Sequence, residues 1–182
     1  VVALSFVEAT SGSGNVITNA TVASSSAMTL VASKPTVTVS SVQGGTLIPG
    51  AENKVGEFTV AADANGKISV ASTTINLSAV GITGPVFNSF RIADGNTTIS
   101  TGSVSTSTAT TANVTFVPGY EISAGQSKTF SLYANVSGSA VSGITPYVAS
   151  SLSNAGFKWV DVIGGGAVFT GSSIINFPTN SY

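Results

Sequence analysis

The chain has 182 residues, of which 42% are hydrophobic and only 7% are charged, and its formal net charge is -1. This balance predicts a folded core, because disorder combines low hydrophobicity with high charge. Six scattered Lys and Arg residues argue against the clustered basic surface that nucleic acids and anionic membranes require. No apolar run approaches the ~18 residues of a membrane-spanning helix.

The first predicted element is a strand over residues 1–7, with the sequence VVALSFV. Its side chains alternate, with Val2, Leu4 and Phe6 on one face and Val1, Ala3, Ser5 and Val7 on the other. Both faces favour burial, so the strand is expected inside a sandwich and not at a solvated edge. Two interpretations stay open: it is the first strand of the chain's own sandwich, or it is a donor strand that completes a neighbouring subunit.

The residues after this strand read as a flexible connection. TSGSG, residues 10–14, has the small polar composition of a tether. The expected organisation is a first or donor strand at residues 1–9, the tether, and a single domain over residues 15–182. The low-complexity stretch 100–113 is interpreted as an exposed strand or long loop of that domain, and the alternative is a linker between two small domains.

Alternating apolar residues recur from residue 34 onward and predict antiparallel strands that each bury one face. The residues predicted to point inward are Val37, Val39, Phe58, Val60, Ile68, Val70, Ile75, Leu77, Phe130, Leu132, Ala134 and Val136. The inward face changes phase between Val70 and Ile75, which predicts a β-bulge near Thr73. An all-β fold of roughly nine to twelve strands in two antiparallel sheets is expected.

Turn residues separate these strands. Asn65-Gly66 predicts a hairpin between the Phe58 strand and the Ile68 strand, and Asp94-Gly95 predicts a second hairpin. Further turns are expected at Gly44-Gly45, Pro49-Gly50, Pro118-Gly119 and residues 164–166. The Asp and Asn side chains at the two hairpins are interpreted as turn residues that bond their own backbone, in preference to calcium ligands.

Residues with catalytic potential are scarce. The chain has no His and no Cys, which excludes Ser-His-Asp triads, Cys-His pairs and His-ligated metals. Among the seven acids only Glu52 and Glu57 lie close in sequence, whereas a glycosidase needs two facing carboxylates. We expect no enzyme, no cofactor and no metal site. Trp159, in FKWVDV, is interpreted as a core residue, and Pro178 as the end or edge of a strand.

Five N-x-Ser/Thr triplets are candidate N-glycosylation sites in a chain that holds 29 Ser and 23 Thr. Their acceptors are Asn19, Asn76, Asn96, Asn113 and Asn135. Asn96 is the best placed, because it lies beside a predicted turn. The competing interpretation is that such triplets arise by chance in a chain this rich in hydroxyl residues.

Several stretches resemble the immunoglobulin-like modules of large bacterial surface proteins. They are SKPTVTVSS, IPGAENKVGEFTVAADANGKISV, ISAGQSKTFSLYANVSG, FKWVDV and INFPTNSY, and they span most of residues 33–182. The resemblance implies an immunoglobulin-like or jelly-roll-like sandwich, which a neighbour's donated strand would complete in a polymer. The uncharged, Ser/Thr-rich composition is also similar to that of donor-strand filament subunits of bacterial pili and archaeal threads.

Two functions remain open at this point. The first is a structural subunit of an extracellular filament, a homopolymer in which Val1, Val2, Leu4, Phe6 and Val7 enter the next subunit head-to-tail. The second is an adhesive or carbohydrate-binding module of a larger cell-surface protein. Covalent glycans fit both, and neither involves nucleic acid or a membrane span. A capsid or tail decoration protein fits less well, because it gives no role to the tether.

Overall fold

The computed structural model describes residues 8–10, 16–18, 31–40, 46–102, 109–164 and 166–178. The chain divides into two compact units, Val1–Val31 and Ala32–Tyr182. In the first unit, β1 (Glu8–Thr10) and β2 (Val16–Thr18) pair in an antiparallel ladder. The second unit is a β-sandwich.

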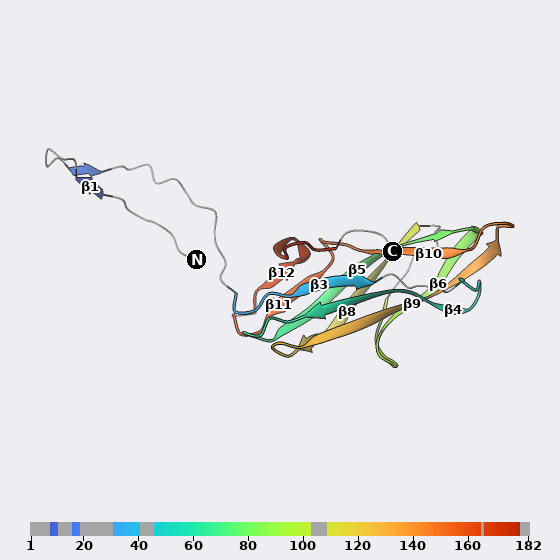
Figure 1. Cartoon of the computed structure of the whole chain (residues 1–182), viewed down its shortest axis with the longest axis horizontal. Coiled ribbons are helices and arrows are strands. Elements are labelled where there is room, and N and C mark those ends of the chain that lie inside the picture. The colour runs from blue at the N-terminus through green and yellow to red at the C-terminus, as the bar shows by residue number, and fades with distance from the viewer. Residues whose placement is uncertain are drawn as a thin grey trace. The chain divides into compact units, whose positions relative to one another are not determined.

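The sandwich consists of two five-stranded antiparallel sheets (Figure 1). Sheet 1 has the order β3 (Thr36–Ser40), β4 (Glu52–Ala61), β9 (Ser127–Ala140), β6 (Ile82–Asp94) and β7 (Thr97–Gly102). In sheet 2, β5 (Ile68–Val80) is central, with β8 (Ala109–Ile122) on one side and both β10 (Tyr147–Leu152) and β11 (Lys158–Asp161) on the other. The three-residue β12 (Val168–Thr170) pairs with β11, and a 3-10 turn follows at Gly171–Ser173.

The prediction of an all-β, two-sheet antiparallel sandwich is confirmed, and the described part of the chain holds twelve strands. Between the sheets lie the apolar faces of the alternating segments. Every residue predicted to point inward is buried except Val39, which is half-buried at the edge strand β3. Phe58 and Phe130 stand opposite each other on β4 and β9, and their rings stack with centroids 4.9 Å apart. The immunoglobulin-like or jelly-roll-like subdivision stays a prediction.

The predicted change of phase in β5 is present, and it falls at Ala71, slightly before Thr73. The ladder with β8 jumps there: Val70 pairs with Tyr120 and Ser72 pairs with Thr115. Four β8 residues, 116–119, therefore stand opposite one residue of β5. The turn predicted at Pro118-Gly119 is wrong for this reason, because both residues lie in a bulge within a continuous strand.

The two predicted hairpins have different outcomes. Asp94-Gly95 is a hairpin turn: Asp94 pairs with Thr97, and Gly95 supplies the positive φ of +58° that the tight turn requires. The hairpin prediction at Asn65-Gly66 is wrong, because β4 and β5 lie in different sheets. A turn is present, in which the backbone N–H of Asn65 donates to Asp63 Oδ1 at 2.9 Å. This turn carries the chain from one sheet to the other.

Trp159, on β11, is a core residue as predicted. Its ring is buried and stacks on Phe169 with centroids 4.7 Å apart, and its Nε1 donates to Ser173 Oγ at 3.1 Å. Phe157 packs against Phe177 at 5.4 Å. Pro178 follows the last described strand and belongs to none.

Candidate functional site

The residues predicted to form the donor strand, Val1, Val2, Leu4, Phe6 and Val7, lie outside the described residues. So does the predicted tether, apart from Thr10, which pairs with Val16 in the β1–β2 ladder. The donor role of this segment stays a prediction. What the structure does give is the surface that the sandwich offers to such a strand.

The edges of the two sheets are almost free of charge. In the ladders of the described residues, β3, β7, β8, β10 and β12 each pair on one side only. Four of them contain no charged residue, and β8 contains only Glu121. Soluble proteins commonly protect edge strands with Lys or other charges, because an unpaired edge accepts further strands. These edges lack that protection.

Three of the four ion pairs of the described residues lie on the central strands of sheet 1. Arg91 on β6 donates through Nε and Nη2 to the Glu52 carboxylate on β4, at 2.7 and 2.6 Å. Its guanidinium also lies 3.9 Å from the centroid of the Tyr133 ring on the intervening strand β9. The hydrogen bond from Arg91 holds the pKa of Glu52 below its ordinary value. This group braces three strands across one face.

A second charged group joins the two sheets at one end of the sandwich. Tyr120 on β8 donates through its hydroxyl to Asp94 Oδ2 at 2.5 Å, and Lys128 on β9 donates to the same oxygen at 2.9 Å. The hydrogen bonds from Tyr120 and Lys128 lower the pKa of Asp94. Burial and the bond to Asp94 raise the pKa of Tyr120. The arrangement is a structural tie, since each polar group is occupied by another.

Asp161 is a buried carboxylate, 1% exposed, at the point where the compact unit begins. Its Oδ2 accepts the Ala32 backbone amide at 2.6 Å, and its Oδ1 accepts the Ile163 amide at 3.2 Å. Burial alone would raise its pKa, but the backbone donors of Ala32, Gly164, Ile163 and Ser33 reverse this and lower it. Asp161 thus fixes the start of the sandwich, at residues 32–33, to its last strands.

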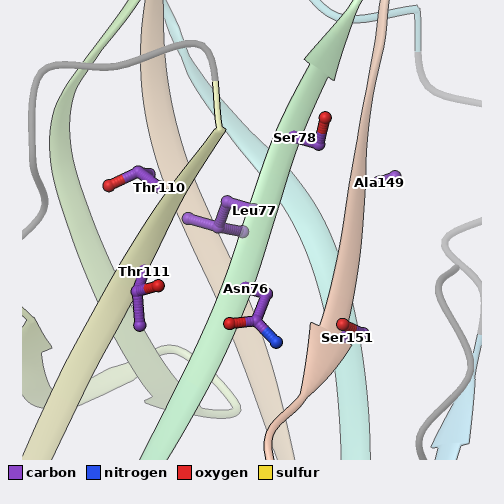
Figure 2. A pocket seen from close by; sticks show the side chains of 7 residues that line it. All are labelled: Asn76, Leu77, Ser78, Thr110, Thr111, Ala149 and Ser151. Carbon is purple, nitrogen blue, oxygen red and sulfur yellow. The ribbon is translucent and has the colours of Figure 1, made fainter.

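The outer face of sheet 2 holds a shallow hollow of about 260 Å³, most of whose lining residues are Ser, Thr and Asn. Figure 2 shows Asn76 on β5 with Thr111 of β8 on one side and Ser151 of β10 on the other. These residues are register partners in the ladders, so their side chains share one face. The lining offers amide and hydroxyl groups and carries no charge. It suits a small neutral polar ligand and provides no acid, base or nucleophile pair.

Four of the five predicted glycosylation acceptors lie in the described part of the chain. Asn76, Asn96 and Asn113 are exposed, and Asn96 lies in the β6–β7 turn as predicted. Asn113 accepts a hydrogen bond from Thr74 Oγ1 at 2.9 Å. Asn135 is half-buried, and its amide donates to the Gly50 carbonyl at 3.0 Å. Asn19 lies outside the described residues.

Two features escaped the sequence analysis. Asp161 alternates with valines in WVDV and carried no signal of burial, because its partners at residues 32–33 are far away in sequence. Val117 is 88% exposed, although the sequence FVPG suggested only a turn. No group of three potential metal-ligating side chains occurs in the described ranges, and no helix there is long and apolar enough to cross a membrane.

Comparison with known proteins adds little. No protein-family model matches the chain, and no curated protein matches it. Among solved structures, the chain is similar to the major pilin subunit BcpA of Bacillus cereus, with 11% identity and a TM-score of 0.34. The likeness covers 92% of this chain and 46% of the pilin chain, so the chain spans less than half of that protein. A likeness at this level carries no argument about function.

Proposed function

We propose that the chain is a structural subunit of an extracellular filament and that residues 1–7 of one copy enter the sandwich of another. The subunits would join head-to-tail, since the donating and accepting surfaces differ, and such a contact propagates without closing. Identical subunits are the main partner, and the exposed acceptors Asn76, Asn96 and Asn113 are candidate sites of covalent glycans. The chain has no catalytic role in this proposal.

The observation that carries the proposal is the state of the sheet edges. Edge strands with unpaired backbone groups and little or no charge are templates for strand addition. Ala32–Tyr182 is a compact unit by itself, and the donated residues 1–7 would come from the other unit of a second copy. A strand that is apolar on both faces and an edge without charge are chemically complementary.

The energy of one junction is substantial. Burying Val2, Leu4 and Phe6 contributes roughly 1.5–3 kcal/mol for each side chain. Each ladder hydrogen bond adds about 0.5–1.5 kcal/mol. The loss of translational and rotational freedom opposes these terms by roughly 4–15 kcal/mol, so a strand that lost its apolar side chains would not hold two subunits together.

Electron microscopy of the purified chain tests the proposal. The unmodified chain is expected to form fibres, and the double variant Leu4→Asp, Phe6→Asp is expected to form none while keeping the circular dichroism of a β-sandwich. Ile175→Asp is the control, because Ile175 is an exposed apolar residue outside residues 1–7 and outside every strand. Fibres that survive the double variant would rule out the donated strand.

A second candidate, an adhesive or carbohydrate-binding module, is favoured by the polar hollow around Asn76, Thr111 and Ser151. Its amide and hydroxyl groups match the hydrogen bonds that a neutral sugar offers. Such a module would stay monomeric. Calorimetric binding of a neutral oligosaccharide, lost in Asn76→Ala, together with a monomeric chain, would establish this alternative in place of the filament.

A further inference from the structure

A hollow of about 500 Å³ lies between an edge strand of each sheet. Its lining comes from Ile99 on β7 and from the β8 residues Phe116, Val117, Pro118, Gly119, Tyr120 and Glu121. We call this surface the β7–β8 groove. Its lining residues include Ile, Phe, Val and Pro, whereas most residues that line the hollow at Asn76 and the one beside Thr73 are Ser, Thr and Asn.

The bulge in β8 creates this groove. Phe116 turns inward and packs against Phe130, with ring centroids 6.1 Å apart. Val117 then points outward and is 88% exposed, the highest fraction among the large hydrophobic residues of the described chain. Residues 116–119 have no partner in the β5 ladder. The bulge therefore places apolar side chains beside a stretch of backbone that has no partner in the β5 ladder.

The two strands that flank the groove each lack a ladder partner on this side. β7 pairs only with β6 and β8 pairs only with β5 in the ladders of the described residues. Beside the groove the two strands meet directly: Ser100 Oγ donates to the Thr115 carbonyl at 3.3 Å, and a Cβ on Gly102 would lie 3.0 Å from Val114 Cγ2. The groove thus has the geometry of a place where an additional strand can join a sheet edge and bury its side chains between the sheets.

From these features we infer that the β7–β8 groove accepts residues 1–7 of a second copy of the chain. The inference rests on the proposed function and specifies its acceptor. Seven extended residues span about 23 Å, and VVALSFV has apolar side chains for the groove and none that is charged. The first charge after it, Glu8, falls beyond the strand.

Charge inside the groove does not oppose this occupant. The one ionised lining residue is Glu121, and Lys67 neutralises it with Nζ–Oε distances of 3.1 and 3.3 Å. Tyr120 directs its hydroxyl to Asp94, which leaves its ring as part of the apolar wall. An apolar strand would therefore leave no buried charge unpaired on binding.

Cysteine cross-linking tests the acceptor, because the full chain has no Cys of its own. Full-length Phe6→Cys is mixed with full-length Val117→Cys and oxidised, and linked peptides are identified by mass spectrometry. The expected product is a Phe6→Cys to Val117→Cys disulfide dimer, at least ten times more abundant than the product with Ile144→Cys. Ile144 is the matched control, since it is 50% exposed and is not one of the residues that line the groove.

A charge-insertion pair keeps the test independent of disulfide geometry. Val117→Lys is expected to lower the polymerised fraction at least tenfold, whereas Val168→Lys, at a residue 60% exposed on β12, leaves it unchanged. Both sites are exposed, so both variants keep the melting temperature of the parent chain. Fibres that persist in Val117→Lys, or cross-linking that favours Ile144→Cys, would overturn the groove and leave the filament standing. A parent chain that stays monomeric would overturn both.

Discussion

Asp161 shows how much one buried carboxylate can organise. Its hydrogen-bond partners among the described residues are backbone amides, with Ala32 and Ile163 at 2.6 and 3.2 Å. Gly164 lies so close that a Cβ there would collide with the Asp161 carboxylate. Asp161 therefore ties the first residues of the sandwich to the loop that follows β11.

Replacing this carboxylate with an amide tests its role. Asp161→Asn is expected to lower the free energy of unfolding by about 1.5–3 kcal/mol, because it weakens hydrogen bonds to a charged acceptor in a buried place. Urea denaturation followed by circular dichroism measures the change. Glu121→Gln, at an exposed ion pair, is the control and should shift stability by about 0–1 kcal/mol.

Stability should also depend on pH. The pKa values of Glu52, Asp94 and Asp161 all lie below their ordinary values. A carboxyl whose pKa is lower in the folded state stabilises the fold above its unfolded pKa, about 4, and loses that contribution as pH falls through the folded value. The unfolding free energy should therefore be constant from pH 7 to about 5 and fall below about 4.

Denaturation midpoints measured from pH 7 to pH 2 follow this loss directly. Asp161→Asn removes one of the three contributions, so its midpoint should fall less steeply than that of the parent chain. A parent midpoint that is unchanged at pH 2 would contradict the assigned pKa directions.

At the scale of elements, the pairing of β4 with β9 holds the centre of sheet 1. Phe58 and Phe130 are direct partners there and both are buried. Phe130→Ala is expected to destabilise the fold by about 3–5 kcal/mol, through lost burial and the cavity left behind. Thr129→Ala, at the neighbouring exposed pair with Thr59, is the control and should cost less than about 1 kcal/mol. Guanidinium unfolding compares the two, and equal losses would contradict this account.

Strand faces could be predicted from the sequence because alternation is a local property of the backbone. Phe58 and Val60 on β4 are inward as a period of two requires, and so are the alternate β9 residues Phe130, Leu132, Ala134 and Val136. Turn formation is also a local property, but the strand with which the next segment pairs is decided by residues far away in sequence. Asn65-Gly66 makes a turn without making a hairpin, since the strand that follows joins the other sheet.

The candidate site was less accessible from the sequence. The sequence alone predicts the apolar segment at residues 1–7 and the candidate glycosylation acceptors Asn76, Asn96 and Asn113. The β7–β8 groove is not, because it depends on a bulge whose register becomes clear only when Val70 and Tyr120 are seen to pair. Asp161 depends likewise on a contact with Ala32 across most of the chain.

For the whole molecule, the proposed junction between subunits is almost purely apolar. Charges are 7% of the chain, and none belongs to residues 1–7 or remains unpaired in the β7–β8 groove. Assembly should therefore not weaken between about 50 mM and 1 M NaCl, a range over which screening abolishes contacts between exposed charges. Light scattering at matched protein concentrations measures this. A large decrease with salt would indicate an electrostatic junction and contradict the donated strand.

Sedimentation velocity shows whether residues 1–7 of one chain are held by another chain. The full-length chain over a series of concentrations should give masses that are multiples of 18.0 kDa and that grow with concentration. Phe6→Asp at the same concentrations should give a single folded species of one chain. A parent chain that sediments as a single molecule throughout the series would contradict the donated strand.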